Sequence, residues 1–172
     1  MTALRGLALL LALAGPACAY DKPLIGPRLG ASTDLGQTWA PLMLAGAGAL
    51  PLTLFRDEVF WANVETDRGR FVFDNPRTTY PDLLPGLGAE LMFLVNNPHP
   101  KHDGGTTPWT EAGAAAFGRY TAAVLQRFPG IGIVEVGNEM PTAPAARKIE
   151  GDFNVRAELT QAVREVIPKY TV

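Results

Sequence analysis

The chain has 172 residues, a formal net charge of −2 and 47% hydrophobic residues, a composition typical of a folded globular domain. Its 15 Lys and Arg residues nearly balance its 17 Asp and Glu residues, so charge gives no reason to expect a nucleic-acid partner. The sequence contains no G-x-G-x-x-G, G-x-x-x-x-G-K-[ST] or G-x-S-x-G motif. It therefore predicts neither nucleotide binding nor serine-hydrolase chemistry, and we expect no cofactor.

Residues 1–19 have the pattern of a secretory signal peptide. Arg5 gives a short positive region, residues 7–14 are apolar, and residues 17–19 read Ala-Cys-Ala, a small-x-small cleavage pattern. We expect a mature domain over residues 20–172 that is secreted or periplasmic, with no membrane contact after cleavage. An uncleaved membrane anchor is the alternative. Cys18 is the only cysteine and would leave with the signal, so the mature chain would lack disulfides and thiolate ligands, which favours a bacterial setting.

Strand and helix patterns alternate along the rest of the chain. Apolar, β-branched runs predict strands, and apolar residues at helical spacing, bounded by capping residues, Pro or Gly, predict helices. Residues 98–108 read as a surface loop. Strands are predicted at residues 29–33, 50–55, 90–97 and 131–136 and from residue 170, and helices at residues 38–50, 79–87, 110–128 and 152–167.

Polar residues gather just after the predicted strands. Arg56 follows the second strand, Asn96 and Asn97 end the third, and Asn138 and Glu139 follow the fourth. Alternating strands and helices indicate an α/β fold with a parallel sheet, and functional residues at strand carboxyl ends are typical of a (β/α)8 TIM barrel. A complete barrel needs about 250 residues. We therefore predict a TIM-barrel type with only about its first four βα units present.

Two tryptophans and two histidines lie on the predicted loops. Trp61 and Trp109 could stack on sugar rings, and packing within the loops is the equal alternative. His99 and His102 could bind a metal with Asp103, but histidines on loops are more often exposed, so we predict no metal site. His99 could instead line a sugar subsite.

The other acidic residues near the strand ends are weaker candidates for a catalytic role. Asp57, Glu58 and Asp103 fall on loops, where carboxylates are most often solvated. Glu135 lies four residues before Glu139 on the same strand face, about 13 Å away at about 3.3 Å per residue, which is too far for a catalytic pair. We predict that Glu135 points inward and pairs with a basic residue.

The sequence resembles the first half of a clan A glycoside hydrolase, closest to family 39 and to its family 5 neighbours. The segments that carry the resemblance are LTLFRDEVFWANVETDRGRFVFD, LMFLVNNP, TEAGAAAFGRYTAAVLQRFPG and VEVGNEM. In those enzymes an Arg ends the second strand, a Trp, an acidic residue and a G-x-F-x-F-like stretch follow, and Asn-Glu ends the fourth strand. The residues matching that order are Arg56, Trp61, Glu65, Gly69, Phe71, Phe73, Asn138 and Glu139.

The resemblance implies a retaining glycosidase acting on a carbohydrate substrate. By it, Glu139 would be the general acid/base, Asn138 would bind the sugar 2-hydroxyl, and Arg56 would keep the nucleophile ionised. Trp61, Asn97, His99 and Trp109 are further candidates for substrate contact. In the clan the nucleophile comes from the seventh strand, which this chain lacks, so the missing C-terminal half-barrel is a candidate partner. A non-catalytic or vestigial carbohydrate-binding half-barrel and a truncated gene product are the alternatives.

Overall fold

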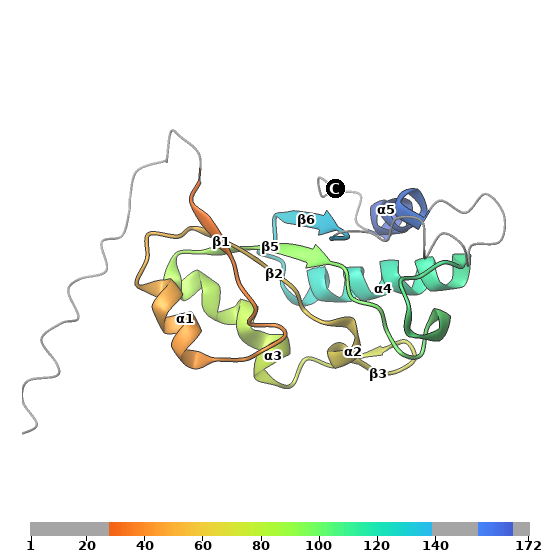
Figure 1. Ribbon diagram of the computed structural model, residues 1–172, viewed down its shortest axis with the longest axis horizontal. Coiled ribbons are helices and arrows are strands. Elements are labelled where there is room, and N and C mark those ends of the chain that lie inside the picture. Colours follow the sequence, from red (N-terminus) through yellow and green to blue (C-terminus); the bar gives the residue numbers. More distant parts are fainter. Residues whose placement is uncertain (1–27, 139–154, 167–172) are drawn as a thin grey trace, which may run out of the picture.

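The computed structural model describes residues 28–138 and 155–166 (Figure 1). The predicted signal segment 1–19, the predicted strand from residue 170 and Glu139 lie outside these residues. The described part confirms an α/β fold with a parallel sheet, whose strands stand side by side in chain order. The barrel itself stays a prediction. The strands of this sheet are β1 (Gly30–Ser32), β2 (Leu54–Asp57), β5 (Glu90–Val95) and β6 (Ile133–Val136).

The helices follow the strands and cover the sheet (Figure 1). Helix α5 packs against α4, and the 3-10 helix η1 contacts β5. The helical segments are α1 (Pro41–Gly48), α2 (Trp61–Val64), α3 (Pro76–Thr79), η1 (Tyr80–Leu87), η2 (Asp103–Gly105), α4 (Glu111–Arg127) and α5 (Val155–Val166). No helix in residues 28–138 and 155–166 combines the length and the apolar character needed to cross a membrane.

The two faces of the sheet differ in character. Side chains alternate along a strand, and on β2 the buried Phe55 joins the hydrophobic core whereas Arg56 points to the opposite face. On β6 the same alternation buries Val134 in the core and places Glu135 on the face of Arg56. One face therefore packs against helices η1 and α4, and the other brings charged residues together.

Helix α4 is the element that the sequence predicted best. The Thr110 hydroxyl accepts a hydrogen bond from the Gly113 N–H at 3.0 Å, so Thr110 is the N-cap as expected. The residues predicted to share its apolar face are buried in the core: Ala114, Phe117, Tyr120, Val124, Leu125 and Phe128.

Three segments differ from the sequence prediction. The second strand begins at Leu54 and includes Arg56, whereas we predicted residues 50–55 with Arg56 after them. The loop after it contains α2 and a two-stranded hairpin, β3 (Glu65–Asp67) and β4 (Arg70–Phe71), which turns at Gly69 with φ of 77°. The helix predicted at residues 79–87 is η1, because Pro81 and Pro85 supply no N–H for regular α-helical bonds.

The contact between α4 and α5 yields a stability prediction. A Cβ added at Gly118 would lie 2.7 Å from the Ala162 carbonyl oxygen of α5. Gly118→Ala should therefore lower the free energy of unfolding by about 1–3 kcal/mol, as overpacking does. Gly46 in α1 has nothing within 4 Å of an added Cβ, so Gly46→Ala should raise that free energy by up to about 1 kcal/mol. Urea denaturation measures both, and equal stabilisation by the two substitutions would contradict the close packing of α5 on α4.

Candidate active site

The carboxyl edge of the sheet carries a connected group of polar side chains. Arg56 of β2 donates from Nε to Glu135 Oε2 at 2.7 Å and from Nη2 to Glu135 Oε1 at 2.9 Å. The predicted pairing of Glu135 with a basic residue is therefore confirmed. The hydrogen bonds from Arg56 lower the pKa of Glu135, and the same pair raises the pKa of Arg56. Both side chains stay ionised, and they lie about 30% exposed on the face away from the core.

Asn138 is tied to this pair and to the neighbouring strand. Arg56 Nη2 also donates to Asn138 Oδ1 at 3.1 Å, and the Asn138 N–H donates to Asn96 Oδ1 at 3.0 Å. Gly137, with φ of 80°, makes the turn that leads out of β6. The Asn138 Oδ1 is thus occupied, whereas its Nδ2 makes no hydrogen bond with the described residues. The side-chain amide can still donate to a ligand. Glu139 follows directly in the sequence and lies outside the described residues.

Glu58 is a member of this group that the sequence reading missed. We predicted Glu58 on a solvated loop, but its carboxylate is half-buried beside Arg56 and accepts a hydrogen bond from Asn97 Nδ2. Burial, followed by the nearby Asp57 carboxylate, raises the pKa of Glu58 to about 7, against the opposing effect of Arg56. A carboxyl that titrates near neutral pH at a strand end is a candidate for proton transfer or ligand binding.

Asp57 is buried and holds a loop, which also corrects the prediction of a solvated carboxylate. It is 3% exposed and accepts hydrogen bonds from the Thr33 hydroxyl at 2.6 Å and from the Leu35 N–H at 2.7 Å. The Glu58 N–H donates to it as well, at 2.7 Å. Burial raises the pKa of Asp57, and these hydrogen bonds oppose the rise. Asp57 therefore fixes the backbone on which Glu58 stands.

Trp61 belongs to the core, which corrects its prediction as a substrate contact. Its side chain is fully buried, and its ring stacks on Tyr120 at 5.4 Å and on His102 at 4.7 Å between centroids. Its Nε1–H donates to Glu65. No face of the indole is left for a sugar ring, because the two neighbouring rings occupy both.

His99 is likewise a structural residue and not a sugar contact. It is 3% exposed, its Nδ1 accepts from the Lys101 N–H at 3.0 Å, and its Nε2 lies 2.7 Å from the Glu65 carbonyl oxygen. The Nε2 therefore carries the proton and donates to that carbonyl. Burial lowers the pKa of His99, which keeps the ring neutral. The segment 98–108, predicted as a surface loop, is anchored in the interior by this side chain.

Glu65, His99 and His102 place their ligand atoms within 4.8 Å of one another, which raises the question of a metal ion. The Glu65 oxygens already accept hydrogen bonds from Trp61, from the Gly69 N–H at 2.5 Å and from His102 Nε2 at 3.1 Å. Burial raises the pKa of Glu65, but these hydrogen bonds outweigh it and the pKa lies below its ordinary value. Both nitrogens of His99 are also engaged, so the three residues form a hydrogen-bonded cluster that does not fit a metal.

Asp103 does not form a metal site with the two histidines, and it has a different structural role. Its carboxylate accepts from the Trp109 N–H at 2.7 Å and from the Thr110 N–H at 3.0 Å, so it fixes the start of α4. This corrects both its predicted solvation and its suggested place in a metal site. Trp109 is half-buried at this turn. Among the predicted substrate contacts, the structure therefore brings together Arg56, Asn97 and Asn138, with Glu58 added.

Comparison with known proteins supports the fold alone. No family model and no curated protein matches the chain. Among solved structures, it is similar to a family 39 glycoside hydrolase from the gut symbiont Bacteroides cellulosilyticus WH2, with 16% sequence identity and a TM-score of 0.56. The match covers 83% of this chain and 30% of that chain. The chain has a distant glycoside hydrolase-like fold and spans less than a third of the matched chain's length.

Glu58 gives a pH-dependent prediction. Because the folded state holds the proton of Glu58 up to about pH 7 and a free Glu carboxyl releases it near 4.5, ionisation of Glu58 costs stability as pH rises through this range. Glu58→Gln removes that cost and leaves an acceptor for Asn97. We therefore expect the difference in free energy of unfolding, Glu58→Gln minus wild type, to increase by about 1–2 kcal/mol from pH 4 to pH 8. This range allows for solvent screening of the half-exposed carboxyl.

Thermal unfolding across this pH range measures the gain. Glu158→Gln, at an exposed position of α5, is the matched control for the loss of a carboxylate. A stability difference between Glu58→Gln and the wild type that stays constant or shrinks as pH rises would contradict the raised pKa of Glu58.

Proposed function

We propose that this chain is the N-terminal half of a retaining glycoside hydrolase barrel that cleaves O-glycosidic bonds in a polysaccharide or oligosaccharide. One observation carries the proposal: Arg56 joins Glu135 and Asn138 at the carboxyl edge of a parallel sheet, immediately before Glu139 in the sequence. Active sites of (β/α) barrels lie at this edge. The likeness to a family 39 glycoside hydrolase supports the fold on which the proposal rests.

In this proposal Glu139 is the general acid/base. It protonates the glycosidic oxygen as the bond breaks and then removes a proton from the incoming water. Asn138 donates from Nδ2 to the sugar 2-hydroxyl. The hydrogen bond from Arg56 to Asn138 Oδ1 supports this role, because it fixes which end of the amide faces the ligand.

Arg56 acts here as a positioning residue. Its bidentate contact with Glu135 compensates much of its charge, so its effect on a nucleophile is weaker than the resemblance alone implies. A retaining mechanism needs a second carboxylate about 5–5.5 Å from the acid/base. We propose that this nucleophile comes from a C-terminal half-barrel that also covers the sheet face of Arg56 and Glu135.

The alternative is a carbohydrate-binding half-barrel without turnover. The chain spans only 30% of the glycoside hydrolase chain that it matches, which favours this alternative if the chain acts by itself. In both cases residues 1–19 are proposed to direct secretion or periplasmic export, and the partner is a carbohydrate.

The test is the Glu139→Gln substitution in the protein as its host secretes it. With an oligosaccharide substrate, we expect turnover to fall about 10²–10⁴-fold, the usual effect of losing an acid/base group. A 2,4-dinitrophenyl glycoside should lose less in its first step, because its leaving group needs no proton. Azide should restore the second step, because azide attacks without a base.

Glu158→Gln on the exposed side of α5 is the control and should leave turnover unchanged. Normal oligosaccharide hydrolysis by Glu139→Gln would overturn the assignment of Glu139. Oligosaccharide binding by a wild type that hydrolyses none of the substrates would replace hydrolysis with the non-catalytic alternative.

A further inference from the structure

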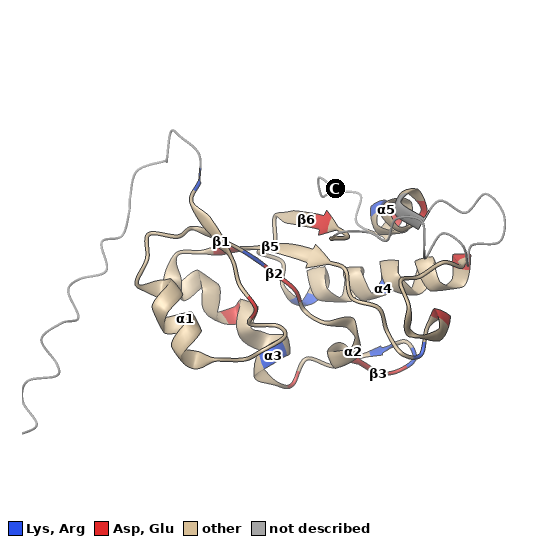
Figure 2. Ribbon diagram, in the orientation of Figure 1, with Lys and Arg blue, Asp and Glu red and all other residues tan. Residues whose placement is uncertain are grey.

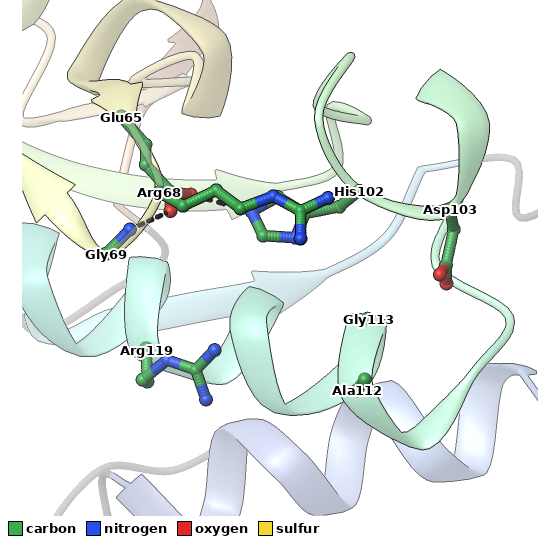
Figure 3. A pocket seen from close by; sticks show the side chains of 8 residues that line it. All are labelled: Glu65, Arg68, Gly69, His102, Asp103, Ala112, Gly113 and Arg119. Carbon is green, nitrogen blue, oxygen red and sulfur yellow. Dashed lines mark hydrogen bonds and ion pairs between the residues drawn. The ribbon is translucent and has the colours of Figure 1, made fainter.

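A second candidate site is a cavity formed by residues other than Arg56, Asn97, Asn138 and Glu58. It has a volume of about 340 Å³ and opens between the β3–β4 turn, the segment after β5 and helix α4 (Figure 3). Its size is at the lower end of the range for small-molecule pockets. The residues that line it are Glu65, Arg68, Gly69, His102, Asp103, Ala112, Gly113 and Arg119.

The carboxylates of this cavity have their oxygens occupied. Glu65 accepts hydrogen bonds from Trp61, the Gly69 N–H and His102. Asp103 accepts two backbone N–H groups on Oδ2 and the Thr110 hydroxyl on Oδ1, the last at 2.8 Å. A ligand that needs acceptors therefore finds few of them in the cavity.

Two arginines supply free hydrogen-bond donors to the cavity. Arg119 reaches from α4 toward the cavity and makes no hydrogen bond or ion pair with the described residues (Figure 3). Arg68 donates from Nη2 to the Lys101 carbonyl oxygen. Its Nε and Nη1 make no hydrogen bond with the described residues. The β3–β4 hairpin carries acidic as well as basic residues (Figure 2), and its other basic residue, Arg70, is paired with Asp67 at 3.8 Å.

We propose that this cavity is a binding site for an oxyanion, a carboxylate, sulfate or phosphate group carried by a small molecule. Guanidinium groups present planar pairs of N–H donors that match the oxygens of such anions. A metal cation does not fit, since two arginines face the cavity and its carboxylate oxygens are already hydrogen-bonded. The site is separate from the proposed hydrolysis and does not depend on it.

The rigid floor of the cavity supports binding. His102 stacks on Trp61 with 16° between ring planes and is held by Glu65 at 3.1 Å, so the wall behind Arg68 is fixed. A Cβ added at Gly113 would lie 2.1 Å from Asp103 Oδ2, so a glycine is required where α4 meets this wall. Arg68 and Arg119 therefore stand beside a wall of fixed shape, which lowers the cost of ordering the site on binding.

The test is a titration of the full chain with sodium sulfate, followed through backbone amide NMR signals of Gly69, His102 and Gly113. We expect saturable shifts that sodium chloride at equal ionic strength does not produce. Arg119→Gln should weaken sulfate binding at least tenfold, because it removes the charged donor without breaking a hydrogen bond or ion pair to the described residues. Arg164→Gln, an exposed position on α5, should leave the affinity unchanged.

Parallel titrations with inorganic phosphate and with glucuronate distinguish tetrahedral anions from a sugar carboxylate. Saturable binding of sulfate, phosphate or glucuronate that becomes weaker in Arg119→Gln supports the site. Shifts that grow linearly and equal those of chloride would overturn the proposal. So would sulfate affinity of the Arg119→Gln protein equal to that of the wild type, provided that thermal unfolding shows both proteins folded.

Discussion

The ion pair between Arg56 and Glu135 spans the sheet from β2 to β6 across the strand between them. Arg56 pairs in register with Met92 of β5, and Glu135 pairs with Leu94 of the same strand, so the two charged side chains reach over β5. A pair that is about 30% exposed adds little to stability. Its value is geometric, because the bidentate contact holds the planar guanidinium in one orientation, and that orientation also fixes Asn138.

Three carboxylates hold the loops around this pair. Asp57, Glu65 and Asp103 each accept backbone N–H groups from loops at the carboxyl edge of the sheet. These bonds replace the regular hydrogen bonds that loop backbone lacks. They also keep the candidate active site and the cavity lined by Arg68 and Arg119 in fixed shapes, which binding of a small ligand requires. Among the described residues of this edge, Asp57, Glu65 and Asp103 are therefore anchors of the fold, whereas burial raises the pKa of Glu58 to about 7.

The sequence predicted the elements whose signals are local. Helix α4 was predicted from its cap and its apolar spacing, and the end of β6 at Val136 from the change from apolar to polar residues. The sequence left Trp61 open between sugar stacking and packing, and it offered His99 as a sugar contact, because the contacts that bury both residues come from far along the chain, such as Tyr120 for Trp61. The position of Glu58 depends in the same way on Asn97, 39 residues away. The pairing of Glu135 with a basic residue was predicted correctly, because a charged side chain within a strand needs an opposite charge beside it.

The central claim is that carbohydrate binds at the carboxyl edge of the parallel sheet. The most direct measurement is an NMR titration of the chain with a panel of xylo-, cello- and manno-oligosaccharides, reading the backbone amides of both sheet edges. The account predicts saturable shifts at Asn96, Asn97, Gly137 and Asn138 and none at Gly30, Leu54 and Glu90, near the amino ends of the strands. Shifts confined to the amino ends, or an absence of saturable shifts with every sugar, would contradict it.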